Sequence, residues 1–104
     1  MIRLDQLKRQ LEMRIEKLPV GGAIEVLTYK RNRGITIRKE ADGMLLVREH
    51  GYHEEVYPPV TLAGLDKLVA KIAKREFPRS TNIRIYTHEP GDEMFIQDQL
   101  GIKI

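Results

Sequence analysis

The sequence predicts a single α+β domain in which an antiparallel sheet packs against two amphipathic helices. Two observations predict this class. Apolar residues recur at helical spacing in two segments, and they alternate with polar residues in short segments between those two. The expected order along the chain is α-β-β-β-β-α-β-α, a four-strand antiparallel meander followed by a fifth strand. The length of 104 residues suits one domain, so we expect residues 1–104 to share one core.

The first helix is predicted over residues 2–18, where apolar side chains recur at helical spacing. The residues of this stripe are Leu4, Leu7, Leu11, Ile15 and Leu18. Pro19 and the pair Gly21-Gly22 end the pattern. Residues 23–30 predict a strand, but apolar side chains on both of its faces leave its pairing register open. The segments 35–40, 44–49 and 52–57 complete the meander.

The sequence Ala41-Asp42-Gly43 predicts the turn between the second and third strands of the meander. It suits a three-residue loop with Gly43 in the left-handed conformation. Such a loop pairs Ile37 with Val47.

The pair His50-Gly51 predicts the next turn, because histidine is among the residues that tolerate a positive φ. A two-residue loop at this point pairs Glu49 with Tyr52. Together the two turns put the apolar residues of three strands on one face, and a shift of one residue would scatter them. The expected core face contains Ile35, Ile37, Leu45, Val47, Tyr52 and Val56.

The second helix is expected to begin after Pro58-Pro59, with Thr61 as its N-cap, and to end before Pro78. Its buried stripe is predicted to contain Leu62, Leu65, Val69, Ile72, Ala73 and Phe77. Residues 82–87 predict the fifth strand, and residues 92–100 a short last helix.

Charge is distributed unevenly around a net value of +3. Residues 1–48 hold eleven Lys/Arg against six Asp/Glu, and residues 61–84 hold six against two. Residues 49–60 and 85–104 are acidic. A basic body with acidic segments predicts an anionic partner for one face, and it is equally what self-complementary surfaces would show.

The absence of cysteine excludes a disulfide scaffold, a thiolate metal site and a cysteine nucleophile. The N-terminal segment MIRLDQLKRQLEM mixes charges and has no apolar run, which predicts neither a signal peptide nor a transmembrane helix. We therefore expect a cytoplasmic protein with no membrane contact.

EHGYHEE, residues 49–55, concentrates two histidines and three glutamates. A metal ion needs several ligands that converge on one point. In the expected register His50 lies on the turn, and His53 points outward opposite Arg48, whose charge disfavours a cation. We therefore interpret this segment as a polar hairpin and predict no metal site.

Basic residues in three places predict a nucleic-acid-binding surface. YKRNRG, residues 29–34, makes a hairpin tip that could straddle a phosphate backbone, although such a tip is also an ordinary solvated loop. Arg38 and Arg48 are expected on the sheet face opposite the core, and three lysines follow the solvent side of the second helix. The predicted set contains Lys30, Arg31, Arg33, Arg38, Arg48, Lys67, Lys71 and Lys74.

The same outer face is expected to carry Met44, Leu46 and Tyr57. These side chains predict a protein interface, most simply with a second copy of the chain. Their mixture with arginines is also typical of a sheet on which unpaired bases stack. Two functions therefore stay open: a module that binds nucleic acid or another polyanion such as an acidic protein, and a homo-oligomeric assembly protein without a nucleic-acid role.

THEPGDE, residues 87–93, gathers acidic residues and a histidine around a Pro-Gly turn, with Asp92 as a plausible helix N-cap. No nucleophile elbow, phosphate-binding loop or zinc-protease motif occurs anywhere in the chain. We therefore expect no enzymatic activity, no cofactor and no small-molecule substrate. The role of the acidic tail, residues 88–98, stays open.

Residues 35–57 followed by VTLAGLDKLVAKI, residues 60–72, resemble one known family in the order of their elements. This is the single-stranded-DNA-binding positive-cofactor family of transcription proteins, in which a strand meander precedes a helix. The likeness rests on that order and on the basic strand ITIRKE, residues 35–40, and the helix here lacks an aromatic residue. The resemblance implies a partner with unpaired bases.

Overall fold

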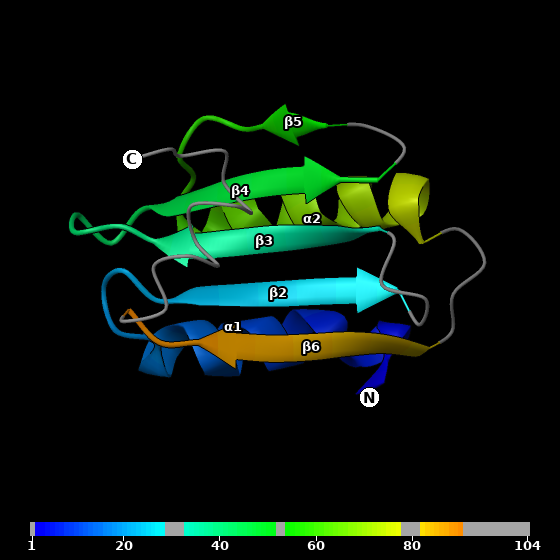
Figure 1. The fold of residues 1–104 in the computed structure, drawn as a ribbon, viewed down its shortest axis with the longest axis horizontal. Coiled ribbons are helices and arrows are strands. Elements are labelled where there is room, and N and C mark those ends of the chain that lie inside the picture. The colour runs from blue at the N-terminus through cyan, green and yellow to red at the C-terminus, as the bar shows by residue number, and fades with distance from the viewer. Residues whose placement is uncertain (1, 29–32, 52–53, 78–81, 91–104) are drawn as a thin grey trace.

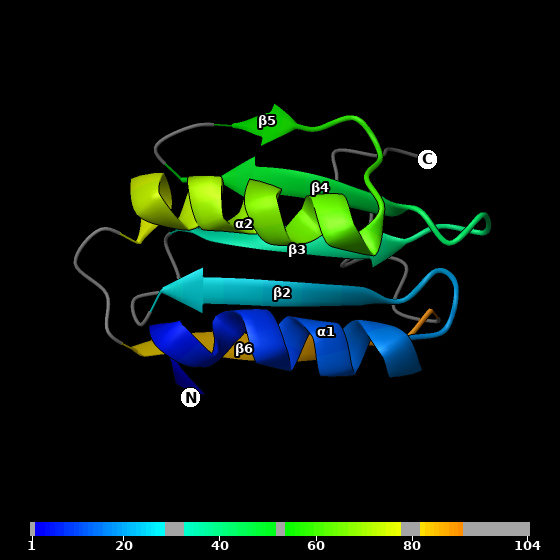
Figure 2. The ribbon, with the colours of Figure 1, turned by 180° about the vertical axis from the view of Figure 1, so that it is seen from behind.

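In the part of the chain that the structure describes, six antiparallel strands form one sheet, and two helices cover one of its faces (Figures 1 and 2). The computed structural model describes residues 2–28, 33–51, 54–77 and 82–90. Its elements are β1 (Ile2–Arg3), a 3₁₀ turn (Leu4–Gln6), α1 (Leu7–Lys17), β2 (Ala23–Thr28), β3 (Gly34–Lys39), β4 (Leu45–His50), β5 (Glu55–Val56), α2 (Leu62–Glu76) and β6 (Asn82–His88). The strands lie in the order β1-β6-β2-β3-β4-β5. The α+β class is thus confirmed, but the described residues contain one more strand than expected, and the order of elements along the chain differs because β1 precedes α1.

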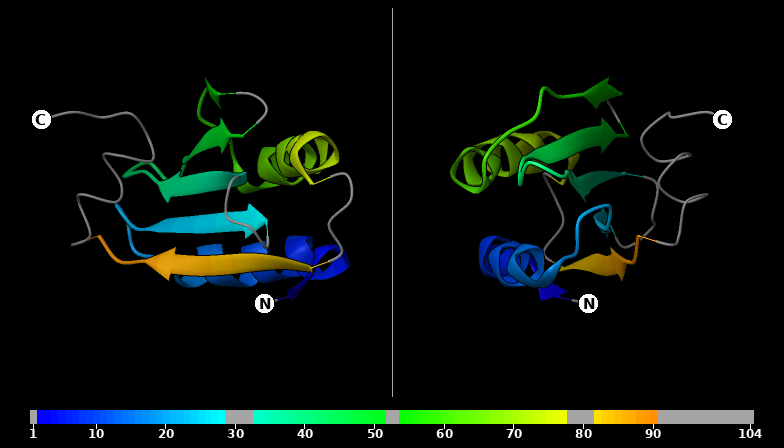
Figure 3. Two further views of the ribbon diagram at one scale, coloured as in Figure 1. Left: turned by 45° about the vertical axis from the view of Figure 1, so that its right-hand side comes forward. Right: turned by 90° about the vertical axis from the view of Figure 1, so that its left-hand side faces the viewer.

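The two helices lie side by side and run in opposite directions, α1 over β6 and β2, and α2 over β3 and β4 (Figures 2 and 3). The core fills the layer between helices and sheet. Its fully buried large side chains include Leu11, Ile24, Ile35, Ile37, Leu45, Leu65, Ile72, Phe77 and Ile83. We call the sheet face opposite α1 and α2 the outer face.

The first helix is shorter than the sequence predicted. Leu7, Leu11 and Ile15 are buried as expected, but Ile2 and Arg3 form β1 and pair with β6 instead of starting the helix. Ile2 pairs with Ile83, which is about 80 residues away in the sequence. Helical periodicity near the N-terminus could not reveal this strand pairing.

The predicted turn between β3 and β4 is confirmed. Gly43 has φ 80°, and Ile37 pairs with Val47. The Asp42 carboxylate accepts a hydrogen bond from the Met44 backbone N–H at 2.9 Å, which supports the tight turn.

The predicted turn after β4 is wrong. His50 is the last residue of β4, and Glu49 pairs with Glu55 rather than with Tyr52. This partner lies three residues further along the chain, and a shift by an odd number of residues reverses the faces of a strand. Val56, expected in the core, is therefore 51% exposed, and Tyr57, expected on the outer face, is buried.

The fifth predicted strand, β6, pairs with β2, the first strand of the meander, and lies between β1 and β2. Ile24 of β2 therefore has Ile37 on one side and Thr87 on the other, which settles the register that the sequence left open. The predicted last helix, residues 92–100, lies outside the described residues.

The second helix begins where the sequence predicted. The Thr61 hydroxyl accepts a hydrogen bond from the Gly64 backbone N–H at 3.2 Å, as an N-cap does. Leu65, Val69 and Ile72 are buried, but Leu62, expected in the buried stripe, is 40% exposed. Leu62 lies at the first helical position and lines a shallow hollow beside Met13 of α1.

Replacing the cap should destabilise the domain. Thr61→Ala removes the acceptor for the Gly64 N–H and should lower the free energy of unfolding by about 1 kcal/mol, measured by urea denaturation. Thr61→Ser keeps the hydroxyl, so its free energy of unfolding should stay close to that of the unchanged protein. Equal stability of the alanine variant and the original chain would show that the cap contributes nothing.

Candidate nucleic-acid interface

Three lysines form a row on the solvent side of α2. Because the apolar stripe of this helix faces the sheet, Lys67, Lys71 and Lys74 are all exposed. With a helical rise of 1.5 Å per residue, the row extends roughly 10 Å along the axis. Among the described residues, no carboxylate lies within 4.0 Å of these lysines. We call these three residues the lysine row.

The C-terminal end of α2 lies close to Arg33, which belongs to the basic segment YKRNRG, residues 29–34. We call this segment the basic hairpin. The Thr28 N–H donates to the Arg33 carbonyl at 3.0 Å, which closes the connection from β2 to β3. A Cβ at Gly51 would come within 2.9 Å of the Arg33 side chain, and it would also collide with the Glu76 carboxylate. Arg33 therefore lies beside the last residue of α2. Lys30 and Arg31, predicted for the tip, lie outside the described residues.

Two other predicted residues, Arg38 and Arg48, lie on the outer face, opposite the lysine row. Both are half-buried, and each has a glutamate nearby. Arg38 Nε lies 3.8 Å from Glu40 Oε2, and an Arg48 guanidinium nitrogen lies 3.6 Å from Glu54 Oε2. The predicted basic set is thus divided between the two faces of the sheet.

Polar side chains of the outer face also pair across strands. His88 Nε2 lies 3.2 Å from Glu25 Oε1, and His50 Nε2 lies 3.4 Å from the Thr36 hydroxyl. Burial, and then the positive charge of Arg48, lowers the pKa of His50 below its ordinary 6.5. His50 is therefore neutral at physiological pH and adds no charge to this face.

The segment EHGYHEE is split by the sheet. Glu49 points into the core, His50 points to the outer face, and His53 lies outside the described residues. In the part of the chain that the structure describes, no group of three or more His, Asp or Glu side chains could hold a metal ion.

Of the predicted protein interface, Met44 and Leu46 are half-buried, and Leu46 lies on the outer face beside Arg38. The placement of Tyr57 with them was wrong. The changed register of β5 turns Tyr57 to the core side of the sheet, where it is 8% exposed.

A buried polar cluster that the sequence did not reveal joins β4 to α2. Glu49 is fully buried, yet its carboxylate accepts hydrogen bonds from the Tyr57 hydroxyl at 2.6 Å and from Arg75 Nε at 2.8 Å. A second Arg75 nitrogen also donates to Glu49, and it lies 2.8 Å from the Tyr57 oxygen. The sequence did contain one sign of this cluster: Glu49 follows Leu45 and Val47 at an inward position of an alternating strand. A buried carboxylate needs a cation and hydrogen-bond donors nearby.

These contacts determine the ionisation of the cluster. Burial by itself raises the pKa of the Glu49 carboxyl. Hydrogen bonds with Arg75, Glu76 and Tyr57 outweigh burial and lower this pKa from 4.5 to about 2. Burial and the hydrogen bond to Glu49 raise the pKa of Tyr57 from 10.0 to about 12. Glu49 is therefore ionised and Tyr57 neutral over the whole physiological range.

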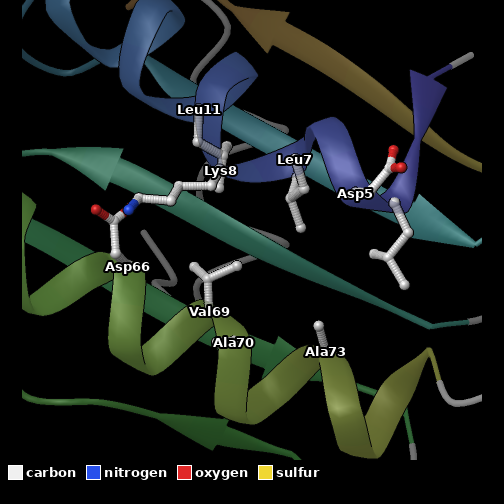
Figure 4. A pocket seen from close by; sticks show the side chains of 9 residues that line it. Asp5, Leu7, Lys8, Leu11, Asp66, Val69, Ala70 and Ala73 are labelled. Carbon is white, nitrogen blue, oxygen red and sulfur yellow. The ribbon is translucent and has the colours of Figure 1, made fainter.

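An apolar groove of about 200 Å³ separates the two helices (Figure 4). Its walls include Leu7 and Leu11 of α1 and Val69 of α2. At one end Lys8 and Asp66 point toward each other across the groove (Figure 4). The groove is lined by two carboxylates, Asp5 and Asp66, as well as by Lys8. It therefore does not extend the basic surface of the lysine row.

Comparison of the chain with family models, with curated proteins and with solved structures found no match. Within the described residues, neither helix combines the length and apolar character that crossing a bilayer requires.

The buried cluster should make stability depend on pH in acid. Because the pKa of Glu49 is lower in the folded state, its stabilisation is complete above pH 4.5 and is lost as the pH falls toward about 2. The loss should amount to about 3 kcal/mol in the free energy of unfolding.

The variant Glu49→Gln should be less stable at neutral pH and should lose most of this acid dependence, measured by urea denaturation at a series of pH values. Glu55→Gln, which changes the exposed residue paired with Glu49, is the matched control and should retain the dependence. The same pH profile in Glu49→Gln as in the original chain would contradict the assignment.

Proposed function

We propose that the chain is a non-enzymatic cytoplasmic module that binds nucleic acid through the lysine row and the adjoining basic hairpin. The observation that carries this proposal is the exposure of Lys67, Lys71 and Lys74 on one helix face, without a carboxylate within 4.0 Å among the described residues. Unneutralised cations in a row attract a chain of phosphates, and releasing the counterions of the phosphates drives binding.

The surroundings of the lysine row support this proposal. Ala63 and Ala70, both exposed, are the small residues on the same side of α2, so a nucleic-acid backbone could approach the lysines closely. Arg33 lies beside Glu76 at the C-terminal end of the helix. We include Lys30 and Arg31 in the proposed interface because they lie within three residues of Arg33 in the sequence.

The arginines of the outer face have a smaller part in the proposal. Arg38 and Arg48 are half-buried and lie within 4.0 Å of Glu40 and Glu54, respectively. Phosphates that approached them would have to compete with these carboxylates. The lysine row has no such competitor in the described part of the chain.

Salt titration tests the proposal directly. Binding to labelled DNA, offered both as duplex and as single strand, should weaken steeply between about 50 mM and 200 mM salt. The triple variant Lys67→Gln, Lys71→Gln, Lys74→Gln should reduce the slope of log K against log salt by roughly one per lysine, measured by fluorescence anisotropy.

The matched control is Arg3→Gln, Arg9→Gln, Lys17→Gln, which removes the same charge from exposed positions of β1 and α1. It should keep most of the salt slope. Equal losses in the two triple variants would show that the net charge of the domain, and not the lysine row, attracts DNA. Failure to bind any DNA at low salt would end the proposal.

Self-association is a second candidate, and exposed apolar residues favour it. Met13 and Leu62 are 46% and 40% exposed, and both line the hollow between α1 and the β3–β4 turn. Association through the sheet edges is less favoured, because β1 and β5 at the two edges have only two residues each.

If Met13 and Leu62 form an interface, sedimentation equilibrium should give a mass above 12.1 kDa that rises with concentration. Leu62→Asp should then restore the monomer mass, because it places a charge in an apolar contact, whereas Val20→Asp, at another exposed apolar position, should not. A monomer mass at the highest soluble concentration would rule this interface out.

A further inference from the structure

The chemistry of α2 bears on which kind of nucleic acid it can hold. Specific contacts to base edges are made mainly by arginine, asparagine and glutamine, and single strands are held largely by stacking on aromatic rings. The helix sequence LAGLDKLVAKIAKRE contains no asparagine, glutamine, histidine or aromatic residue. Phe77, directly after the helix, is 2% exposed and belongs to the core.

Arg75 is the single arginine of α2, and its guanidinium group is already engaged. Its Nε donates to Glu49 at 2.8 Å, and another of its nitrogens contacts both Glu49 and the Tyr57 oxygen. A two-pronged contact with guanine would require Arg75 to leave a fully buried carboxylate without its cation, which is costly. Arg75 is therefore not available to read bases.

The lysine row itself is suited to phosphates at high density. Neighbouring lysines of the row lie about 6 Å and 4.5 Å apart along the helix axis. A duplex carries one charge per about 1.7 Å of its axis with both strands counted, or one per about 3.4 Å for each strand. A stiff duplex therefore presents its phosphates to the row already in order. A flexible single strand has to be ordered on binding, and α2 has no aromatic ring to offset that cost.

From these observations we infer that the lysine row holds double-stranded nucleic acid, DNA or RNA, through its phosphates and does not read the base sequence. The inference rests on the proposed function and adds the ligand class. The resemblance of residues 35–72 implied a partner with unpaired bases. A duplex is inferred instead, because the lysine row lies on α2 and not on the face of the strand meander.

The test is a binding series with the full chain at one low salt concentration. The probes are two DNA duplexes of unrelated sequence and equal length, an RNA duplex of the first sequence, and the separate strands of the first DNA duplex. The two DNA duplexes should bind within about twofold of each other, and each single strand should bind at least about tenfold more weakly than its duplex.

Each outcome decides between the alternatives. Single strands that bind as tightly as the duplex, or a tenfold preference for one duplex sequence, would overturn this inference and leave the proposed function standing. No binding to any of the probes would overturn both. Binding to either type of duplex supports the inference, and the tighter of the DNA and RNA duplexes identifies the source of the ligand.

Discussion

The buried ion pair between Glu49 and Arg75 is the interaction on which the arrangement of α2 depends. Glu49 occupies an inward position of β4 and has no exposed surface, so without a partner its charge would cost several kcal/mol. Arg75 of α2 and the hydroxyl of Tyr57 supply the hydrogen bonds that compensate for lost water. One carboxylate therefore holds together three parts of the chain: strand β4, the segment after β5, and the last turn of α2.

This ion pair occupies the arginine of α2. The apolar stripe of the helix faces the sheet and leaves Lys67, Lys71 and Lys74 exposed, whereas Arg75 reaches Glu49 of β4. The arginine of the helix is thereby used for stability, and the lysines remain for a partner. A helix that presents only lysines can recognise the charge and spacing of phosphates, which is the basis of both the proposed function and the ligand class.

Local signals predicted the parts of this fold that depend on neighbours in the sequence. Thr61 caps α2, and Gly43 makes the turn that pairs Ile37 with Val47, because both effects act within a few residues. The register of β5 was missed because it depends on Tyr57 reaching Glu49 and on a cation from a distant helix. The lysine row could be read from helical spacing alone. The position of Arg38 on the other face of the sheet could also be predicted, because strand alternation puts Arg38 opposite the apolar residues that face the helices.

The most direct test of the account is an NMR titration of the full chain with a short nucleic-acid duplex. We expect the backbone and side-chain signals of Lys67, Lys71 and Lys74 to shift most, and those of Thr36 and Arg38 on the outer face to stay near their free positions. The signal of the Arg75 Nε–H should remain unchanged, since this group stays bound to Glu49. The largest shifts at Thr36 and Arg38, with an unaffected lysine row, would contradict the account.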